Sequence, residues 1–139
     1  MTRLNISSEG KFEDAYGYSR AVRIGNVIKV SGTCAVGPDG EVVGVGDAAA
    51  QAERCFEIIA AALEAAGASL GDIVANRIYL TNTAHAEAVG EVHGRIFGDV
   101  KPCCTMLAVS ALIHPAWLVE IESEALVSEE TGESPTVTH

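Results

Sequence analysis

Positive charge and long apolar runs are both scarce in this 139-residue sequence. Nine Lys and Arg residues stand against nineteen Asp and Glu residues, which gives a net charge of −10. A chain this acidic repels phosphate backbones and anionic lipid headgroups, so we expect neither nucleic-acid nor membrane partners. No run of about 18 apolar residues is present, and the sequence therefore predicts no membrane-spanning helix.

Cysteines are few and lack the spacing of a metal site. Cys34, Cys55, Cys103 and Cys104 form no CxxC pair of the kind that structural zinc sites use. We therefore predict free thiols and no metal. The first twenty residues contain no apolar segment typical of a signal peptide, so a cytoplasmic location is expected.

Length and hydropathy predict one domain. Hydrophobic residues make up 48% of the chain, enough for a single core over residues 1–127. Residues 128–139 are polar, have no apolar face to bury and are predicted to be a disordered tail. Residues 1–15 are also polar, and we expect them to be irregular.

Two strands and a helix are predicted in the first half of the chain. Strands over 18–24 and 27–34 flank Gly25-Asn26, a two-residue link typical of a β-hairpin. Asp47 is a favourable N-cap. The helix that follows has an apolar stripe at Ala52, Phe56, Ile59 and Leu63, and Gly67 is expected to end it.

The second half predicts a strand over 73–80, a helix from Asn82 or Thr83 to Gly98, and two further strands joined by a short proline-containing turn. In the last strand, Val119, Ile121 and Ala125 alternate with Glu120, Glu122 and Glu124, which indicates one buried and one polar face. The order of elements predicts an α+β fold, with a mixed sheet and two helices packed on one face. The other sheet face would be uncovered, and self-association is the expected remedy.

Several short motifs, taken together in order, resemble the Rid family (YjgF/YER057c/UK114). They include Val30-Ser31-Gly32-Thr33, Ala65-Ala66-Gly67-Ala68-Ser69-Leu70-Gly71-Asp72, Tyr79-Leu80-Thr81, Pro102 and Val119-Glu120-Ile121-Glu122. The resemblance covers roughly residues 15 to 127. It implies a chorismate-mutase-like fold with a mixed six-stranded sheet, and a homotrimer with small-molecule clefts between subunits. Members of this family include imine and enamine deaminases that need no cofactor.

One position departs from the pattern of the deaminase members. Those members carry P-x-R-[ST], whose arginine binds the substrate carboxylate, whereas this chain has Pro102-Cys103-Cys104-Thr105. Cys104 stands in the place of the arginine, and a thiol cannot form the paired hydrogen bonds of a guanidinium. We therefore expect a substrate other than a typical 2-imino acid.

The resemblance makes Glu120 the candidate catalytic residue, although strand alternation alone would leave it a solvated glutamate. The candidate ligand-binding residues are Tyr18, Arg20, Ser31, Gly32, Cys104 and Thr105. Arg20 shares a strand face with Tyr18 and is a possible replacement for the missing cation. Cys103 is expected in the core and His93 on the surface. The alternative to a hydrolase is a non-catalytic member that binds a metabolite or a partner protein.

Overall fold

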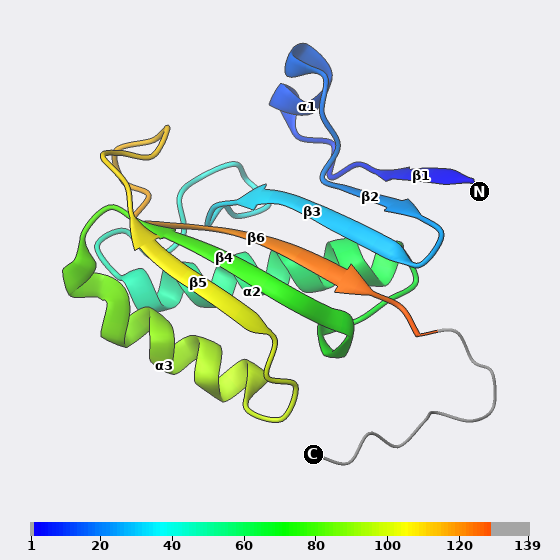
Figure 1. The fold of residues 1–139 in the computed structure, drawn as a ribbon. Coiled ribbons are helices and arrows are strands. Elements are labelled where there is room, and N and C mark those ends of the chain that lie inside the picture. Colours follow the sequence, from blue (N-terminus) through cyan, green and yellow to red (C-terminus); the bar gives the residue numbers. More distant parts are fainter. Residues whose placement is uncertain (1, 129–139) are drawn as a thin grey trace.

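The computed structural model describes residues 2–128 as one sheet and its covering helices (Figure 1). The predicted tail, apart from Ser128, lies outside these residues. The elements in chain order are β1 (Arg3–Ile6), α1 (Lys11–Tyr16), β2 (Ala21–Ile24), β3 (Val27–Thr33), α2 (Ala48–Ala65), η1 (Leu70–Asp72), β4 (Ile73–Leu80), η2 (Thr83–His85), α3 (Ala86–Phe97), β5 (Cys103–Ala108) and β6 (Val119–Leu126).

The six strands form one mixed sheet in the order β1-β2-β3-β6-β4-β5. Neighbouring strands are antiparallel except β4 and β5, which are parallel and joined through α3. Helices α2 and α3 pack on the same face, and the short helix α1 stands apart in an N-terminal arm (Figure 1). The α+β fold with two covering helices is therefore confirmed.

The core lies between the sheet and α2. Phe56, Ile59 and Leu63 on the predicted stripe are each at most 2% exposed, and they meet Ile28, Ile78 and Ile121 from the sheet. The carboxylate of Asp47 accepts from the backbone N–H of Ala50 at 3.0 Å, as the N-cap prediction requires. Gly67 follows the helix with φ of +85°, a conformation that favours glycine.

The hairpin prediction is confirmed, and the prediction for the N-terminus is wrong. Gly25-Asn26 joins β2 to β3, with Gly25 at φ +59°. Residues 1–15, expected to be irregular, contain β1 and most of α1. β1 extends the sheet by pairing with β2, so its backbone groups find partners that polar composition alone does not reveal.

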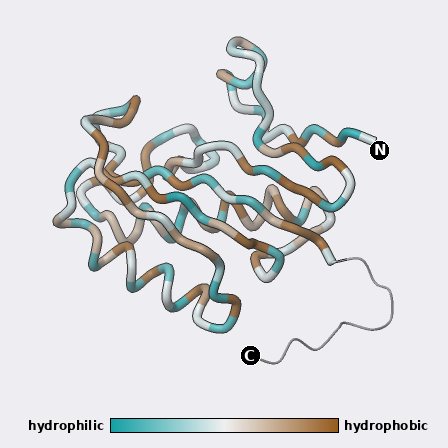
Figure 2. The backbone as a smooth tube through the Cα atoms, in the orientation of Figure 1, coloured by the Kyte–Doolittle hydropathy of each residue, from teal (hydrophilic) through white to brown (hydrophobic). Residues whose placement is uncertain are grey.

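The two last strands are not neighbours, contrary to the short turn expected between them. In the sheet, β4 lies between β5 and β6. The connection from the end of β5 to the start of β6 is the ten-residue segment 109–118. Figure 2 shows hydrophobic residues at the protruding end of this segment, where Ile113 is 94% exposed.

A chain of polar side chains, buried on the sheet and half-buried on α3, connects β6 and β4 to α3. Ser123 donates to the Asn76 Oδ1 atom at 2.6 Å, and Asn76 Nδ2 lies 3.0 Å from His93 Nε2. His93 also packs against Phe56 and Phe97. The expectation that His93 is a surface residue is therefore wrong.

The sheet face opposite the helices carries the three glutamates of β6, each with a different partner. Glu120 accepts from the Cys34 thiol, Glu122 accepts from the Tyr79 hydroxyl, and Glu124 pairs with Lys29 at 2.7 Å. We call this surface the open face. Because each of the three carboxylates has its own partner, the repulsion that like charges on one strand produce is reduced.

Candidate active site on the open face

A β-bulge interrupts the pairing of β3 with β6. Val30 pairs with Ser123, and the next pair along the strands is Thr33 with Ile121. Two residues of β3 therefore lie opposite one residue of β6. One extra residue reverses the side-chain alternation that follows it. Thr33 is therefore buried on the helix side, and Cys34 is turned to the open face opposite Glu120.

Side chains satisfy three consecutive carbonyl groups of the bulge. The Thr33 hydroxyl donates to the carbonyl of Ser31 at 2.8 Å, and Arg20 Nη2 donates to that of Gly32 at 2.7 Å. The thiol of Cys55, from α2, donates to the carbonyl of Thr33 at 3.2 Å. These bonds replace ladder hydrogen bonds that a bulge loses, and they fix its conformation.

Glu120 is held against the bulge on two sides. Cys34 Sγ donates to Oε1 at 3.1 Å, while a Cβ atom on Gly32 would lie only 2.6 Å from Oε2. Burial, and then the hydrogen bond to Glu120, raise the pKa of the Cys34 thiol far above its usual range. The thiol therefore stays protonated and acts as a donor, not as a nucleophile.

A hollow of about 310 Å³ opens beside this carboxylate. Its lining comes from β3, β4, β6 and the segment after β5, and consists of Gly32, Tyr79, Val109, Ala111, Leu112, Glu120 and Glu122. The apolar side is formed by the segment after β5, and the polar side by two carboxylates and a phenol. This combination of apolar wall and convergent polar groups is typical of a small-molecule site.

The phenol of Tyr79 is hydrogen-bonded to Glu122. Its hydroxyl donates to Glu122 Oε1, and that bond, followed by burial, raises the pKa of Tyr79. Tyr79 therefore remains a neutral phenol in the hollow. The seven lining residues include no Lys, Arg or His, so the hollow of a single chain favours a neutral or cationic ligand over an anion.

Arg20 lies near Glu120 but does not line the hollow. Its guanidinium is turned toward the Gly32 carbonyl, and its Nε atom is buried without a hydrogen-bond partner among the described residues. Burial lowers the pKa of Arg20, and the neighbouring Tyr18 and Glu120 oppose that shift. Arg20 therefore supports the bulge through the Gly32 carbonyl, and its charge acts on Glu120 at longer range.

Tyr18 and Ser31, two further predicted residues, do not line the hollow. Tyr18 precedes β2 and is 44% exposed, and the Ser31 hydroxyl donates to the carbonyl of Ser19 at 2.7 Å. Of the residues predicted from the sequence, Gly32 and Glu120 line the hollow itself.

Cys104 and Glu120 lie on opposite faces of the sheet. Cys104 is the partner of Asn76, whose side chain meets His93 on the helix side. Thr105 is the partner of Arg77 and belongs to the open face, two strands away from β6. Cys103, expected in the core, is exposed because β5 is an edge strand with little packed over it. One chain thus does not bring Cys104 or Thr105 to the Glu120 carboxylate.

Sequence reasoning missed Cys34, Tyr79 and Glu122 as parts of this site. Strand alternation placed Glu122 on the polar face, but nothing in the sequence indicated that Tyr79 of the neighbouring β4 would donate to it. Cys34 was missed because the bulge reverses the alternation of β3. Gly32 was the one signal for this bulge, since glycine in a strand often marks one.

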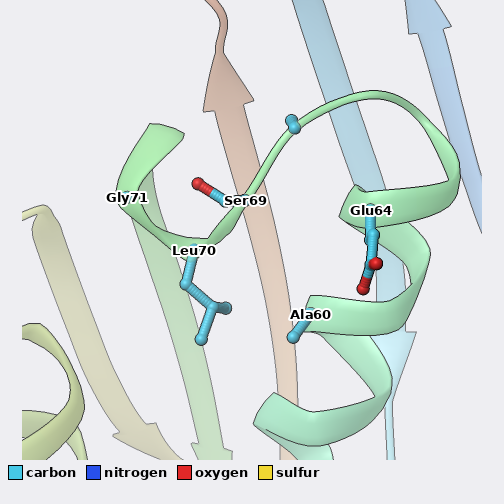
Figure 3. Close-up of a pocket in the computed structure, with 6 residues that line it drawn as sticks. Ala60, Glu64, Ser69, Leu70 and Gly71 are labelled. Atoms are coloured by element: carbon cyan, nitrogen blue, oxygen red, sulfur yellow. The ribbon is translucent and has the colours of Figure 1, made fainter.

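The remaining groups of the described chain offer less chemistry. Residues 2–128 contain no cluster of three or more His, Cys, Asp or Glu side chains that could hold a metal ion. Within the same residues, no helix has the length and hydropathy to cross a membrane. A second depression, of about 360 Å³, lies between α2 and η1 (Figure 3). Glu64 is the one titratable residue among the six that line it, and Ser69 is engaged with Asp72.

Comparison with known proteins identifies the family. The family described as endoribonuclease L-PSP matches residues 9–127. The chain belongs to the Rid (YjgF/RutC) family. A crystal structure of a YjgF/YER057c/UK114 member from Mycobacterium tuberculosis superposes with a TM-score of 0.82 at 45% identity, covering 91% of this chain and 100% of the other.

Two further Rid relatives span most of the chain. The 3-aminoacrylate deaminase RutC of Acinetobacter baylyi is 36% identical over 127 residues, 91% of this chain and 100% of that protein. The YjgF structure from E. coli has a TM-score of 0.75 at 28% identity, covering 88% of this chain and 93% of the other. The chorismate-mutase-like fold expected from the resemblance agrees with these structures.

Proposed function

We propose that this protein hydrolyses the C–N bond of a small imine or enamine without a cofactor, with Glu120 as the catalytic acid and base. The observation that carries the proposal is the position of the Glu120 carboxylate in the lining of the open-face hollow. The deaminase activity named for the relative from Acinetobacter baylyi supports the reaction class.

A single carboxylate has the right chemistry for this reaction. Water adds to the carbon of the protonated imine and loses one proton, which gives a carbinolamine. The C–N bond then breaks as the amino nitrogen gains one proton and leaves as ammonia, while the hydroxyl releases its remaining proton to solvent and becomes the carbonyl. Glu120 takes the proton from the attacking water and returns it to the departing nitrogen. For an enamine, the protonated carboxyl first delivers a proton to the β-carbon, which produces the imine.

The charge of the hollow favours a substrate without a carboxylate. Glu120 and Glu122 both line it, and the resemblance places Cys104 where deaminase members have their carboxylate-binding arginine. An uncharged imine or its protonated form suits such a lining better than an anion. The same argument disfavours RNA, because a chain of net charge −10 repels a phosphate backbone.

We further propose that the hollow is completed in a homotrimer, where a neighbouring copy would cover the open face. The support is that no helix of residues 2–128 covers this face (Figure 1), and that Leu107 on β5 and Ile113 beyond it are exposed. Light scattering on a sizing column would give three times the chain mass if this proposal is correct.

Imine trapping tests the activity. An amine oxidase supplies an uncharged imine, an amino-acid oxidase supplies a 2-imino acid, and semicarbazide traps whatever the protein has not hydrolysed. The wild type should lower the semicarbazone yield from the uncharged imine, Glu120→Gln should not, and Glu124→Gln should behave as wild type because Glu124 does not line the hollow. Cys104 lies on the opposite sheet face from Glu120 within one chain, so Cys104→Arg should restore use of the 2-imino acid only if a neighbouring copy brings its β5 to the hollow.

The departure at Cys104 also supports a second candidate, a non-catalytic member that binds a metabolite. If the wild type lowers neither semicarbazone yield but binds a neutral amine or imine analogue saturably, the hydrolase proposal fails and this candidate replaces it. RNA incubated in parallel is expected to remain intact.

A further inference from the structure

We propose that Cys34 is a positioning residue: the bulge turns its thiol toward Glu120, where it donates to Oε1 and leaves Oε2 to meet the substrate. This proposal rests on the proposed function for its catalytic consequence. The hydrogen bond itself is independent of that function and is testable without a substrate.

The register of β3 against β6 places Cys34 opposite Glu120. Because Thr33 is the partner of Ile121, the next positions along the antiparallel pair are Cys34 and Glu120. Residues opposite each other on antiparallel strands point to the same face. Without the extra residue at the bulge, Thr33 would stand opposite Glu120 and Cys34 would lie one position further on.

The bulge that sets this register has to be stabilised by side chains. A bulge leaves backbone groups unpaired, and here Arg20, Thr33 and Cys55 each satisfy a carbonyl with a side chain. The Arg20 guanidinium is partly buried and donates to one backbone carbonyl, and its Nε atom has no hydrogen-bond partner within residues 2–128, so this support lowers the stability that the fold could otherwise have. The bulge that Arg20 supports turns the side chain of Cys34 toward the Glu120 carboxylate.

Cys34 and Gly32 both contact the Glu120 carboxylate and fix its orientation. The raised pKa keeps the Cys34 thiol protonated, so its single hydrogen is available for Oε1 at 3.1 Å. Gly32 has no side chain and permits the close approach of Oε2, which a Cβ atom would prevent. The two contacts together restrict rotation of the Glu120 carboxylate, and a fixed orientation is what proton transfer to a bound substrate requires.

Infrared spectroscopy of the S–H stretch tests the contact. A hydrogen-bonded thiol absorbs at lower frequency than a free one, and Cys34→Ala identifies the band in the intact protein. Glu120→Ala should shift this band to the free position, whereas Glu124→Ala, a carboxylate removed from the same strand and face, should leave it in place. A band that Glu120→Ala does not move overturns the proposal.

Kinetics tests the consequence. Cys34→Ala should lower kcat about tenfold, the rate equivalent of one hydrogen bond to a charged group, with KM changed less than twofold. Cys34→Ser, which keeps a donor, should recover most of the loss, and Cys103→Ala, which removes an exposed thiol, should change neither constant. Equal losses in the alanine and serine variants would overturn the positioning role.

The two experiments separate the proposals. If the wild type turns over no imine but Glu120→Ala shifts the band, the proposed function fails while the contact stands. If turnover is normal in Cys34→Ala, the proposed function stands and the positioning role is overturned.

Discussion

Gly32 and Glu120 are in such close contact that no methyl group fits between them. A Cβ atom on Gly32 would lie 2.6 Å from Oε2 and 3.1 Å from the carboxyl carbon of Glu120. The atoms that would have to move belong to the end of a flexible side chain, so the carboxylate yields before the backbone does.

Gly32→Ala should therefore reduce activity with little effect on folding. Displacing Glu120 by about 1 Å is expected to lower kcat by up to about 100-fold. The melting temperature should stay close to that of the wild type. Gly71→Ala is the control, because its added methyl makes only an ordinary 3.6 Å contact and should preserve both quantities. A large fall in melting temperature for Gly32→Ala would show that the bulge, not the carboxylate, gives way.

Arg20→Met should destabilise the fold, because the Gly32 carbonyl loses its donor. Loss of one hydrogen bond to a charged group predicts a decrease of about 1–3 kcal/mol in the free energy of unfolding. Urea unfolding measures it. Arg77→Met is the matched control: Arg77 is exposed and lies 3.8 Å from Glu124, and removing such a surface pair should change stability by less than about 1 kcal/mol. Equal effects of the two variants would contradict the role of Arg20 in the bulge.

Stability should fall as the pH is lowered through the titration range of His93. Asn76 Oδ1 accepts from Ser123, so Nδ2 faces His93 and requires its Nε2 to be an unprotonated acceptor. Burial lowers the pKa of His93 in the folded chain. The unfolded chain, with an ordinary histidine pKa of about 6.5, therefore binds a proton first, and stability is lost as the pH falls below that value.

Urea unfolding at pH 7.5 and pH 5.5 checks this sign. His93→Gln keeps an acceptor that does not titrate, so it should lose less stability than the wild type between these two conditions. His114→Gln, on the exposed segment before β6, should retain the wild-type dependence. A dependence of stability on pH that is the same in all three proteins would refute the assignment to His93.

Gly94→Ala should stabilise α3. Gly94 is exposed in the interior of the helix, and a Cβ atom there would meet no other atom within 4 Å. Alanine is favoured over glycine in helices by about 1 kcal/mol, which corresponds to a rise of a few degrees in melting temperature. A lower melting temperature would indicate that this side of α3 is covered by another copy in solution.

Periodicity in the sequence was sufficient for most elements of the fold. The alternation of Glu120, Ile121 and Glu122 placed the two faces of β6 correctly, and the Gly25-Asn26 link fixed a hairpin. These features depend on neighbouring residues. The pairing of β6 with β3 and β4 depends on residues far away in the chain, and alternation contains no information about which strand is the partner.

The candidate site was predictable only up to the bulge. Counted by twos from Ile28 and Val30, Cys34 falls on the buried face, and the single extra residue moves it to the open face beside Glu120. Tyr79 was equally hidden, because its role depends on β4 lying beside β6. Glu120 and Gly32 were found through the family resemblance, which retains information on tertiary structure that local patterns lack.

The central position of β6 has a consequence for biosynthesis. β6 is the last strand of the described chain, yet it lies between β3 and β4, so neither strand has that neighbour until residues 119–126 have left the ribosome. Until then the chain exposes two unpaired strand edges, which are sites of aggregation. Nascent chains of this protein should therefore depend on chaperones until β6 has emerged, and a stop codon before position 119 should yield insoluble product.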